Sequence, residues 1–333
     1  MTLEDDGPRI HDDVEYSPGP LDRDATFYVA GHRGLVGSAI VRKLEAEGFT
    51  DVVGRTSAEL DLKDREAVFA YFAQTKPRYV ALAAAKVGGI VANNTYPVEF
   101  LSENIQIQTN VIDAALEHDV ERLLFLGSSC IYPKFAPQPI REDSLHTGYL
   151  EHTNDAYAIA KIAGIMHVQA VRREYGRAWI SAMPTNLYGP NDNFDPRGSH
   201  VLPALIRRYS EAAEAGAASV TNWGTGTPRR EFLHVDDMAD ASLHLLEHYD
   251  GPQQVNVGTG SDVTIREIAE TIAAVVGYEG ETVWDTTKPD GTPQKLLDVT
   301  KLADAGWTAQ IGLEDGLRAT VTWFHQHEHA LRK

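Results

Sequence analysis

The sequence predicts an α/β protein built on a doubly wound parallel sheet, with a smaller α/β lobe toward its C-terminal end. Short apolar segments and helical segments alternate, with short links, from residue 26 to about residue 190. This alternation is typical of a parallel sheet whose crossover helices cover both faces. After residue 190 the alternation becomes irregular. We therefore expect a first domain over 25–190 and mainly a second lobe over 191–333, from which the segment near 231–260 returns to the first domain.

Length and composition restrict the class of protein. The chain has 333 residues, of which 43% are hydrophobic, and no apolar run approaches the ~20 residues of a membrane span. The N-terminus lacks the basic start and apolar core of a signal peptide. Cys130 is the only cysteine, which excludes an intrachain disulfide, and a cytoplasmic protein is expected. A net charge of −18 disfavours nucleic acid and anionic membranes as partners.

Residues 1–24 differ from the rest of the chain. Eight acidic residues stand against two arginines there, and glycine and proline interrupt any regular element. Such a segment cannot bury enough apolar surface to fold by itself. We expect a disordered acidic tail.

A glycine-rich turn follows the first predicted strand, residues 26–30. Gly31, Gly34 and Gly37 have the spacing G-x-x-G-x-x-G, and a helical segment starts within the turn. A dinucleotide pyrophosphate requires this order of strand, glycine turn and helix, because the backbone must approach the phosphates and the helix N-terminus must face their charge. The sequence therefore predicts a Rossmann-type dinucleotide site.

The second predicted strand, residues 51–55, indicates which dinucleotide is bound. NAD-selective sites usually place an acid at the end of this strand, but here the positions hold Gly54 and Arg55. Arg33 lies within the glycine turn. Two guanidinium groups near a ribose 2′-phosphate favour NADP, although both arginines could simply be solvated. Asp61 is a candidate acceptor for the adenine amine.

Further candidates follow the next predicted strands. The strand at 78–85 ends in three alanines, small enough for a cofactor to lie across them, and a helix is predicted over 93–118. Ser128 and Cys130 follow the strand at 122–127, where ligands bind in open α/β sheets. A cysteine after a core strand can equally be a packing residue.

Tyr157 and Lys161 open the next helical segment. They are four residues apart, so both side chains project from one face of a helix. We expect the ammonium to lower the pKa of the phenol and so make it a usable proton donor at neutral pH. The alternative is an exposed pair on an ordinary helix, since this spacing is common.

The second lobe contains a cluster of arginines in an otherwise acidic protein. Arg208 and Arg230 could clamp a diphosphate, and Trp223 could stack on a base. Surface arginines and a core tryptophan are the alternative for each of them taken singly. His200, in the polar loop after residue 190, can be read as structural.

The glycine turn, Ser128, Tyr157 and Lys161, in this order, resemble the extended short-chain dehydrogenase/reductase family. The resemblance runs from about Phe27 to the C-terminus, and it is closest to the branch of the family that makes GDP-L-fucose. The matching strings lie at 31–34, 84–90, 127–133, 184–190, 230–237 and 288–293.

The resemblance implies one enzyme with two chemistries. GDP-4-keto-6-deoxy-D-mannose would be epimerised at C3 and C5 and then reduced at C4 by NADPH. Ser128, Tyr157 and Lys161 would form the reductase triad, Cys130 would be the epimerisation base and His200 the acid. This logic is physically sound, because a C4 carbonyl acidifies its neighbours and one pair of donors can stabilise its oxygen in both reactions.

The resemblance also implies the binding residues and a homodimer that packs two long helices per subunit, near 104–117 and 157–174. One departure is Ser57, where the bacterial pattern carries an arginine near the 2′-phosphate, so we expect a weaker preference for NADP over NAD. The substrate would contact Arg208, Trp223, Arg230, Asp290 and Lys295. The cofactor would contact Gly31, His32, Arg33, Gly34, Leu35, Val36, Gly37, Arg55, Asp61, Leu62, Ala84, Lys161, Pro184, Asn186, Leu187 and His200.

Other functions remain open from the sequence: another nucleotide-sugar 4-epimerase or reductase, a 4,6-dehydratase, or a non-catalytic NADP-binding protein. Dehydratases of this group usually carry Asp-Glu after the catalytic hydroxyl residue, but here Ser129 and Cys130 follow Ser128. A 4-epimerase has no need of Cys130 and His200. A non-catalytic relative would often have lost Tyr157 or Lys161, and both are present.

Overall fold

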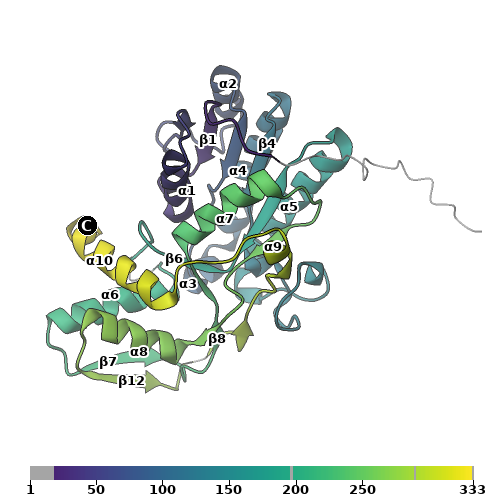
Figure 1. Cartoon of the computed structure of the whole chain (residues 1–333). Coiled ribbons are helices and arrows are strands. Elements are labelled where there is room, and N and C mark those ends of the chain that lie inside the picture. The colour runs from purple at the N-terminus through teal and green to yellow at the C-terminus, as the bar shows by residue number, and fades with distance from the viewer. Residues whose placement is uncertain (1–18, 196–197, 289, 332–333) are drawn as a thin grey trace, which may run out of the picture.

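The computed structural model describes residues 19–195, 198–288 and 290–331, and a six-stranded parallel sheet forms its centre (Figure 1). The order across the sheet is β10-β5-β4-β3-β1-β2, and every neighbouring pair is parallel. The strand order reverses beside β1, which creates the switch point at which open α/β sheets bind ligands. The strands are β1 (Phe27–Ala30), β2 (Val52–Val53), β3 (Tyr79–Leu82), β4 (Arg122–Leu126), β5 (Ile180–Pro184) and β10 (Val255–Val257). The predicted fold class is confirmed.

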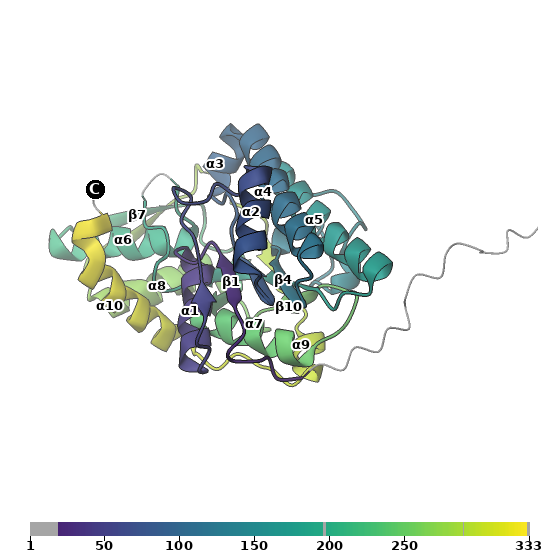
Figure 2. The same cartoon turned by 90° about the horizontal axis from the view of Figure 1, so that it is seen from above.

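Helices cover both faces of this sheet, as Figure 2 shows. Strands β1, β3 and β4 are buried along their whole length, because successive side chains enter different cores. Phe27 and Val29 point to one core, and Tyr28 and Ala30 point to the other. The first core is closed by α1 (Leu35–Ala46) and α7 (Val235–His248), and the second by α2 (Arg65–Thr75), α4 (Pro97–Glu117) and α5 (Asp155–Tyr175).

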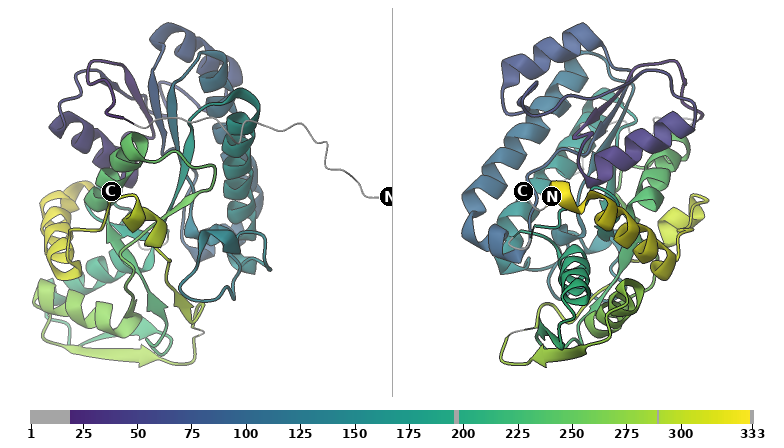
Figure 3. Two further views of the ribbon diagram at one scale, coloured as in Figure 1. Left: turned by 45° about the vertical axis from the view of Figure 1, so that its right-hand side comes forward. Right: turned by 90° about the vertical axis from the view of Figure 1, so that its left-hand side faces the viewer.

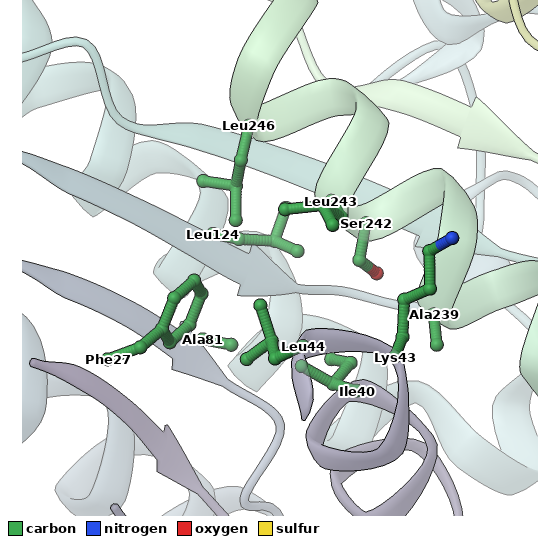
Figure 4. A pocket seen from close by; sticks show the side chains of 10 residues that line it. All are labelled: Phe27, Ile40, Lys43, Leu44, Ala81, Leu124, Ala239, Ser242, Leu243 and Leu246. Carbon is green, nitrogen blue, oxygen red and sulfur yellow. The ribbon is translucent and has the colours of Figure 1, made fainter. Parts of the chain in front are cut away.

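A small apolar pocket lies between the sheet and helices α1 and α7 (Figure 4). Leu44 and Leu246 meet Phe27 and Leu124 there. The two polar members are already engaged: Ser242 Oγ donates to the carbonyl of Met238 at 2.7 Å, and Lys43 pairs with acidic side chains at the rim. The pocket is a packing feature of the core, away from the residues predicted to carry chemistry.

Two helices replace the single helix predicted over 93–118. They are α3 (Ile90–Thr95) and α4, which starts at Pro97. Proline has no N–H to donate within a helix and disfavours helical backbone at the residue before it. Tyr96 accordingly leaves the helical region and caps both elements, while Pro97 occupies the first turn of α4, where no N–H partner is needed.

The second lobe has its own core (Figures 1 and 3). Side chains from three helices, among them Ile206, Ile268 and Phe324, meet there. Strand β7 (Ser219–Trp223) pairs with β12 (Glu281–Asp285), and β8 (Arg229–Arg230) lies between β11 (Val263–Thr264) and β13 (Gln294–Lys295). The helices are α6 (Val201–Glu214), α8 (Ile265–Val276) and α10 (Leu313–Leu331).

Glu231 connects this lobe to the sheet. Its side chain is fully buried, and one carboxylate oxygen accepts the N–H groups of Thr259 and Gly260 at 2.7 and 2.8 Å, just beyond β10. The other oxygen accepts the N–H of Leu297 at 3.0 Å, just beyond β13. Its own carbonyl accepts the Asn186 amide at 2.8 Å, in β6 (Asn186–Tyr188), which pairs with β9 (Phe232–His234).

The start of the described chain packs onto the first domain. Residues 1–18 of the predicted acidic tail lie outside the described residues. Residues 19–24, also assigned to that tail, are held in place: Leu21 is buried and its N–H donates to Glu247 at 3.0 Å. Asp22 forms an ion pair with Arg78 at 2.9 Å. Among the described helices, we find none with the length and apolar character needed to cross a membrane.

Candidate active site

The glycine turn forms a cradle at the carboxyl end of β1. It leads directly into α1, whose first turn has no side-chain cap, so its backbone N–H groups are free to face an anion. A Cβ added at Gly37 would lie 2.1 Å from the carbonyl oxygen of Gly31, so no larger residue fits there. The cradle has the backbone geometry that a dinucleotide pyrophosphate requires.

Basic groups gather where β2 ends. The ring of His32 covers Gly54, because a Cβ at Gly54 would lie 2.3 Å from the imidazole Cγ. No acidic side chain could therefore occupy this position without displacing His32. Burial, followed by the charge of Arg33, lowers the pKa of His32, so this ring is neutral at neutral pH. Arg33 is exposed, and the Arg55 guanidinium lies 5.3 Å from the centre of the Tyr71 ring.

The other predicted cofactor residues lie near the same edge of the sheet. Ala84 follows β3, Pro184 ends β5, and Leu187 lies in β6. Asp61 and Leu62 lie in the link between β2 and α2. The side-chain amide of Asn186 is already engaged by the Glu231 carbonyl. The backbone of Asn186 can therefore face a cofactor as it stands, whereas its side-chain amide would first have to leave the Glu231 carbonyl.

Ser128, Tyr157 and Lys161 come together between the end of β4 and the first turns of α5. The Ser128 hydroxyl accepts the N–H of Cys130 at 3.2 Å, and it lies close enough to the Tyr157 phenol to lower its pKa. The Lys161 Nζ is buried and donates to the Leu126 carbonyl at 2.8 Å. It lies 5.9 Å from the centre of the Tyr157 ring.

The expected effect of Lys161 on Tyr157 is not what the structure shows. Burial raises the pKa of the Tyr157 phenol, negative charge on Cys130 raises it further, and only the Ser128 hydrogen bond lowers it. Burial also lowers the pKa of Lys161 to about 8. We expected the Lys161 charge to dominate, but both side chains are buried. Burial removes water from the two groups and disfavours their charged forms, the phenolate and the ammonium. Without ligands, Tyr157 is a protonated donor.

Cys130 lies beside this triad, half-buried in a short 3₁₀ turn of residues Ser129–Ile131. Its Sγ accepts a hydrogen bond from the Asn154 side-chain amide at 3.3 Å. A second donor is the Lys295 ammonium, 3.7 Å from the sulfur. Lys295 was expected to contact substrate, and here it contacts the cysteine. Asn154, to which no motif in the sequence points, immediately precedes α5.

The substrate residues predicted in the second lobe converge around the ends of β7 and β8. Lys295 is the register partner of Arg230, whose Nη1 donates to the Thr292 carbonyl at 2.6 Å. Asp290 accepts the N–H and hydroxyl of Thr225 at 2.9 and 2.8 Å, two residues after the exposed Trp223. A line of cationic side chains thus runs from Arg230 through the adjacent Lys295 to Cys130.

Arg208 reaches this region from α6, whereas His200 lies at the start of that helix. The Arg208 Nη1 donates to the Asn222 side chain at 2.7 Å, beside Trp223. His200 is the N-cap residue of α6, and its loop approaches α3, with the Gly89 N–H donating to the Gly198 carbonyl at 3.2 Å. The ring reaches solvent, while neighbouring atoms displace enough water to lower its pKa. Among the described residues, no hydrogen bond joins His200 to the triad or to Cys130.

Comparison with known proteins identifies the family. The pattern described as "NAD dependent epimerase/dehydratase family" matches residues 27–258. GDP-L-fucose synthase 1 of Arabidopsis thaliana is 63% identical over 303 residues, covering 91% of this chain and 94% of the relative. The chain belongs to the NAD dependent epimerase/dehydratase family. This confirms the resemblance drawn from the sequence.

Two further proteins show how widely this similarity extends. The GDP-L-fucose synthase of Escherichia coli is 56% identical over 314 residues, covering 92% of this chain and 98% of that one. A solved GDP-L-fucose synthetase from Naegleria fowleri, bound to NADP, has a TM-score of 0.87 at 28% identity and covers 95% of this chain and 99% of its own. The fold and the line of site residues therefore lie within the part of the chain that these relatives share.

Burial of the Lys161 ammonium should lower the stability of the folded chain, and this cost can be measured. Below a pH of about 8 the folded protein must hold its ammonium away from water, whereas an unfolded lysine titrates near 10.5. The unfolded state therefore binds more protons between these values, and stability should rise with pH there. Lys161→Met should raise the free energy of unfolding at neutral pH by up to about 3 kcal/mol.

Urea unfolding of the cofactor-free protein measures this effect. The advantage of Lys161→Met should shrink as pH rises through 8 and vanish near 10.5. Lys76→Met, at an exposed lysine in the turn after α2, is the matched control and should change little. A Lys161→Met variant that is less stable than wild type at every pH would contradict the account.

Proposed function

We infer that this chain converts GDP-4-keto-6-deoxy-D-mannose into GDP-L-fucose, by epimerisation at C3 and C5 followed by reduction at C4 with NADPH. The observation that carries this inference is the contact of two kinds of catalytic group. The hydroxyls of Ser128 and Tyr157 can hold a carbonyl oxygen. Cys130 is next to them, because its backbone N–H donates to the Ser128 hydroxyl and its charge would raise the pKa of Tyr157. The identity of the substrate is inferred from the relatives named GDP-L-fucose synthase.

One oxygen site serves both reactions. With the C4 carbonyl held by Ser128 and Tyr157, removal of a proton from C3 or C5 places negative charge on that oxygen, where two donors stabilise it. Cys130 takes the carbon-bound proton, and His200 returns a proton to the opposite face of the ring. NADPH, when bound, supplies the hydride to C4. Tyr157 then gives its proton to O4, and its raised pKa keeps that proton available.

The cofactor fits the cradle described above. The turn at residues 31–37 receives the pyrophosphate, and Arg33 and Arg55 receive the 2′-phosphate at the end of β2. Gly54 under the His32 ring leaves no room for the acid that an NAD-selective site would place there. Lys161 holds the nicotinamide ribose. The Naegleria fowleri structure bound to NADP supports this choice.

The second lobe binds the nucleotide part of the substrate. Arg208 and Arg230 are arranged to contact the diphosphate, and the exposed Trp223 offers a flat surface for the guanine base. Asp290, held by Thr225, faces this rim and can accept from the guanosine. The first domain, over 25–190 with the returning segment, binds the cofactor, and the lobe closes the site.

The protein acts as a homodimer in the cytoplasm. Ile159, Ala163 and Met166 are exposed along one face of α5, at helical spacing. Helix α5 packs against α4 within the subunit, so a second copy placed on this face would form a four-helix bundle. Such a stripe of apolar side chains gains from a partner, since water would otherwise cover it.

Arg33 offers a test of the cofactor assignment. Loss of one charged contact to a phosphate costs about 1.5–3 kcal/mol. Arg33→Ala should therefore weaken NADPH binding by roughly tenfold or more and leave NADH nearly unchanged, as measured by fluorescence titration. Arg318→Ala, on the exposed face of α10, is the control. Equal losses for NADPH and NADH would remove Arg33 from the 2′-phosphate site.

The central test separates the two chemistries by mutation. Each variant is incubated with the keto sugar in heavy water, without NADPH, and deuterium at C3 and C5 is followed by NMR. Cys130→Ser should abolish most exchange, because an alcohol hardly ionises at neutral pH. It should still oxidise GDP-L-fucose with NADP⁺ in the reverse direction. Tyr157→Phe should lose at least ~10²-fold in reduction while exchange survives in part through Ser128.

The wild-type protein provides the reference for this test. It should consume NADPH only when the keto sugar is present and should release GDP-L-fucose. A reductase or 4-epimerase of another specificity would yield a different sugar, and a non-catalytic NADP-binding protein would yield none. Exchange at the wild-type rate in Cys130→Ser would return Cys130 to a packing role.

A further inference from the structure

Cys130 is held by two donors that come from distant parts of the chain. The Asn154 amide nitrogen lies 3.3 Å from its Sγ, and the Lys295 ammonium nitrogen lies 3.7 Å from it. Asn154 is fixed by its position just before α5, beside the triad. Lys295 belongs to the second lobe. A sulfur that accepts from an ammonium and an amide is in the environment of a thiolate, because both contacts strengthen when the sulfur carries charge.

The backbone around Lys295 is fixed by Glu231. Strand β13 carries Lys295 in register with Arg230 on β8, and the Glu231 N–H donates to the Lys295 carbonyl at 3.4 Å. Two residues later, the Leu297 N–H donates to the buried Glu231 carboxylate at 3.0 Å. Lys295 is therefore anchored on both sides, which limits the volume that its ammonium can sample.

The charge of Lys295 is also available to the sulfur. In the described part of the chain, no carboxylate lies within ion-pair distance of Lys295. Neighbouring lysines differ: Lys134 pairs with Glu151 at 2.8 Å, and Lys301 lies 4.0 Å from Glu142. Cys130 is thus the negatively polarised group that the Lys295 ammonium contacts.

We propose that Lys295, assisted by Asn154, holds Cys130 as a thiolate aimed at the sugar, so that Lys295 is a positioning residue for epimerisation. The proposal rests on the function inferred above. In the step, the thiolate sulfur takes the proton from C3 or C5 and becomes a thiol. The electrons of the broken C–H bond form a C=C bond, and those of the C4 carbonyl move to its oxygen. Since Lys295 comes from the second lobe, the base is complete only when the two lobes are packed together.

The test uses the single thiol of the full chain, without substrate or cofactor. Iodoacetamide reacts with the thiolate, so its rate at neutral pH reports the fraction of Cys130 that is ionised. Even at the dielectric constant of water, two unit charges ~4 Å apart change an equilibrium by about fivefold. Lys295→Met should therefore slow alkylation at least fivefold, and Lys295→Arg should restore most of the rate.

Two controls exclude indirect effects. Lys134→Met removes a charge close to Cys130 in the sequence that pairs with Glu151, and it should leave alkylation unchanged. The rates of wild type and Lys295→Met should converge at alkaline pH, where the thiol ionises without help. A Lys295→Met variant that stays about fivefold slower there would mean a change in access to the sulfur and would overturn the proposal.

Two activity measurements connect the thiolate to epimerisation. Lys295→Met should lose deuterium exchange at C3 and C5 by about the same factor as alkylation. Its kcat for the reduction of NADP⁺ by GDP-L-fucose, which needs no carbon base, should fall far less than its exchange rate, even where KM rises. Unchanged alkylation, with a raised KM in both reactions, would make Lys295 a substrate contact only and overturn the proposal. Absence of exchange in wild type would instead refute the proposed function and leave the alkylation result standing.

Discussion

The architecture depends on the hydrogen bonds that the buried Glu231 carboxylate accepts. This carboxylate accepts backbone N–H groups from beyond β10 at the sheet and from beyond β13 in the second lobe. Burial raises the pKa of Glu231, while these hydrogen bonds lower it, so the N–H groups favour the carboxylate form at a site where burial disfavours it. A charge removed from water and left without them would cost several kcal/mol. Glu231 therefore joins the two lobes. The positions of Arg230 and Lys295, which lie beside it, are fixed by the same hydrogen bonds.

Because Glu231 holds the two lobes together, each lobe can contribute different groups to one site. The sheet supplies what is common to dinucleotide enzymes: a glycine cradle at β1 and a hydroxyl triad between β4 and α5. The second lobe supplies the groups for the nucleotide and, through Lys295, a charge beside Cys130. Burial of Tyr157 and Lys161 keeps the phenol protonated and weakens the ammonium, which suits a donor that waits for charge to develop on a ketone oxygen.

The parts of this account that were predictable from sequence are local. The spacing of Gly31, Gly34 and Gly37 predicts a turn. Helical periodicity predicts that Tyr157 and Lys161 project from the same face. Pro97 could have been used to divide the helix predicted over 93–118, because its ring signals a helix start. The contact between Lys295 and Cys130 spans 165 residues and leaves no periodic trace. Glu231 reads as a surface acid until three backbone segments are known to surround it, and the pKa of Tyr157 depends on water excluded by the whole fold.

The claim that this chain carries out both epimerisation and reduction is tested most directly by a single-turnover reaction with isotopes. The keto sugar and unlabelled NADPH are converted by the wild-type protein in heavy water, and the product is analysed by NMR and mass spectrometry. We predict GDP-L-fucose with deuterium at C3 and C5 and hydrogen at C4, because carbon protons exchange with solvent through the protein whereas the hydride does not. Product without deuterium at C3 and C5, or with deuterium at C4, would contradict the account.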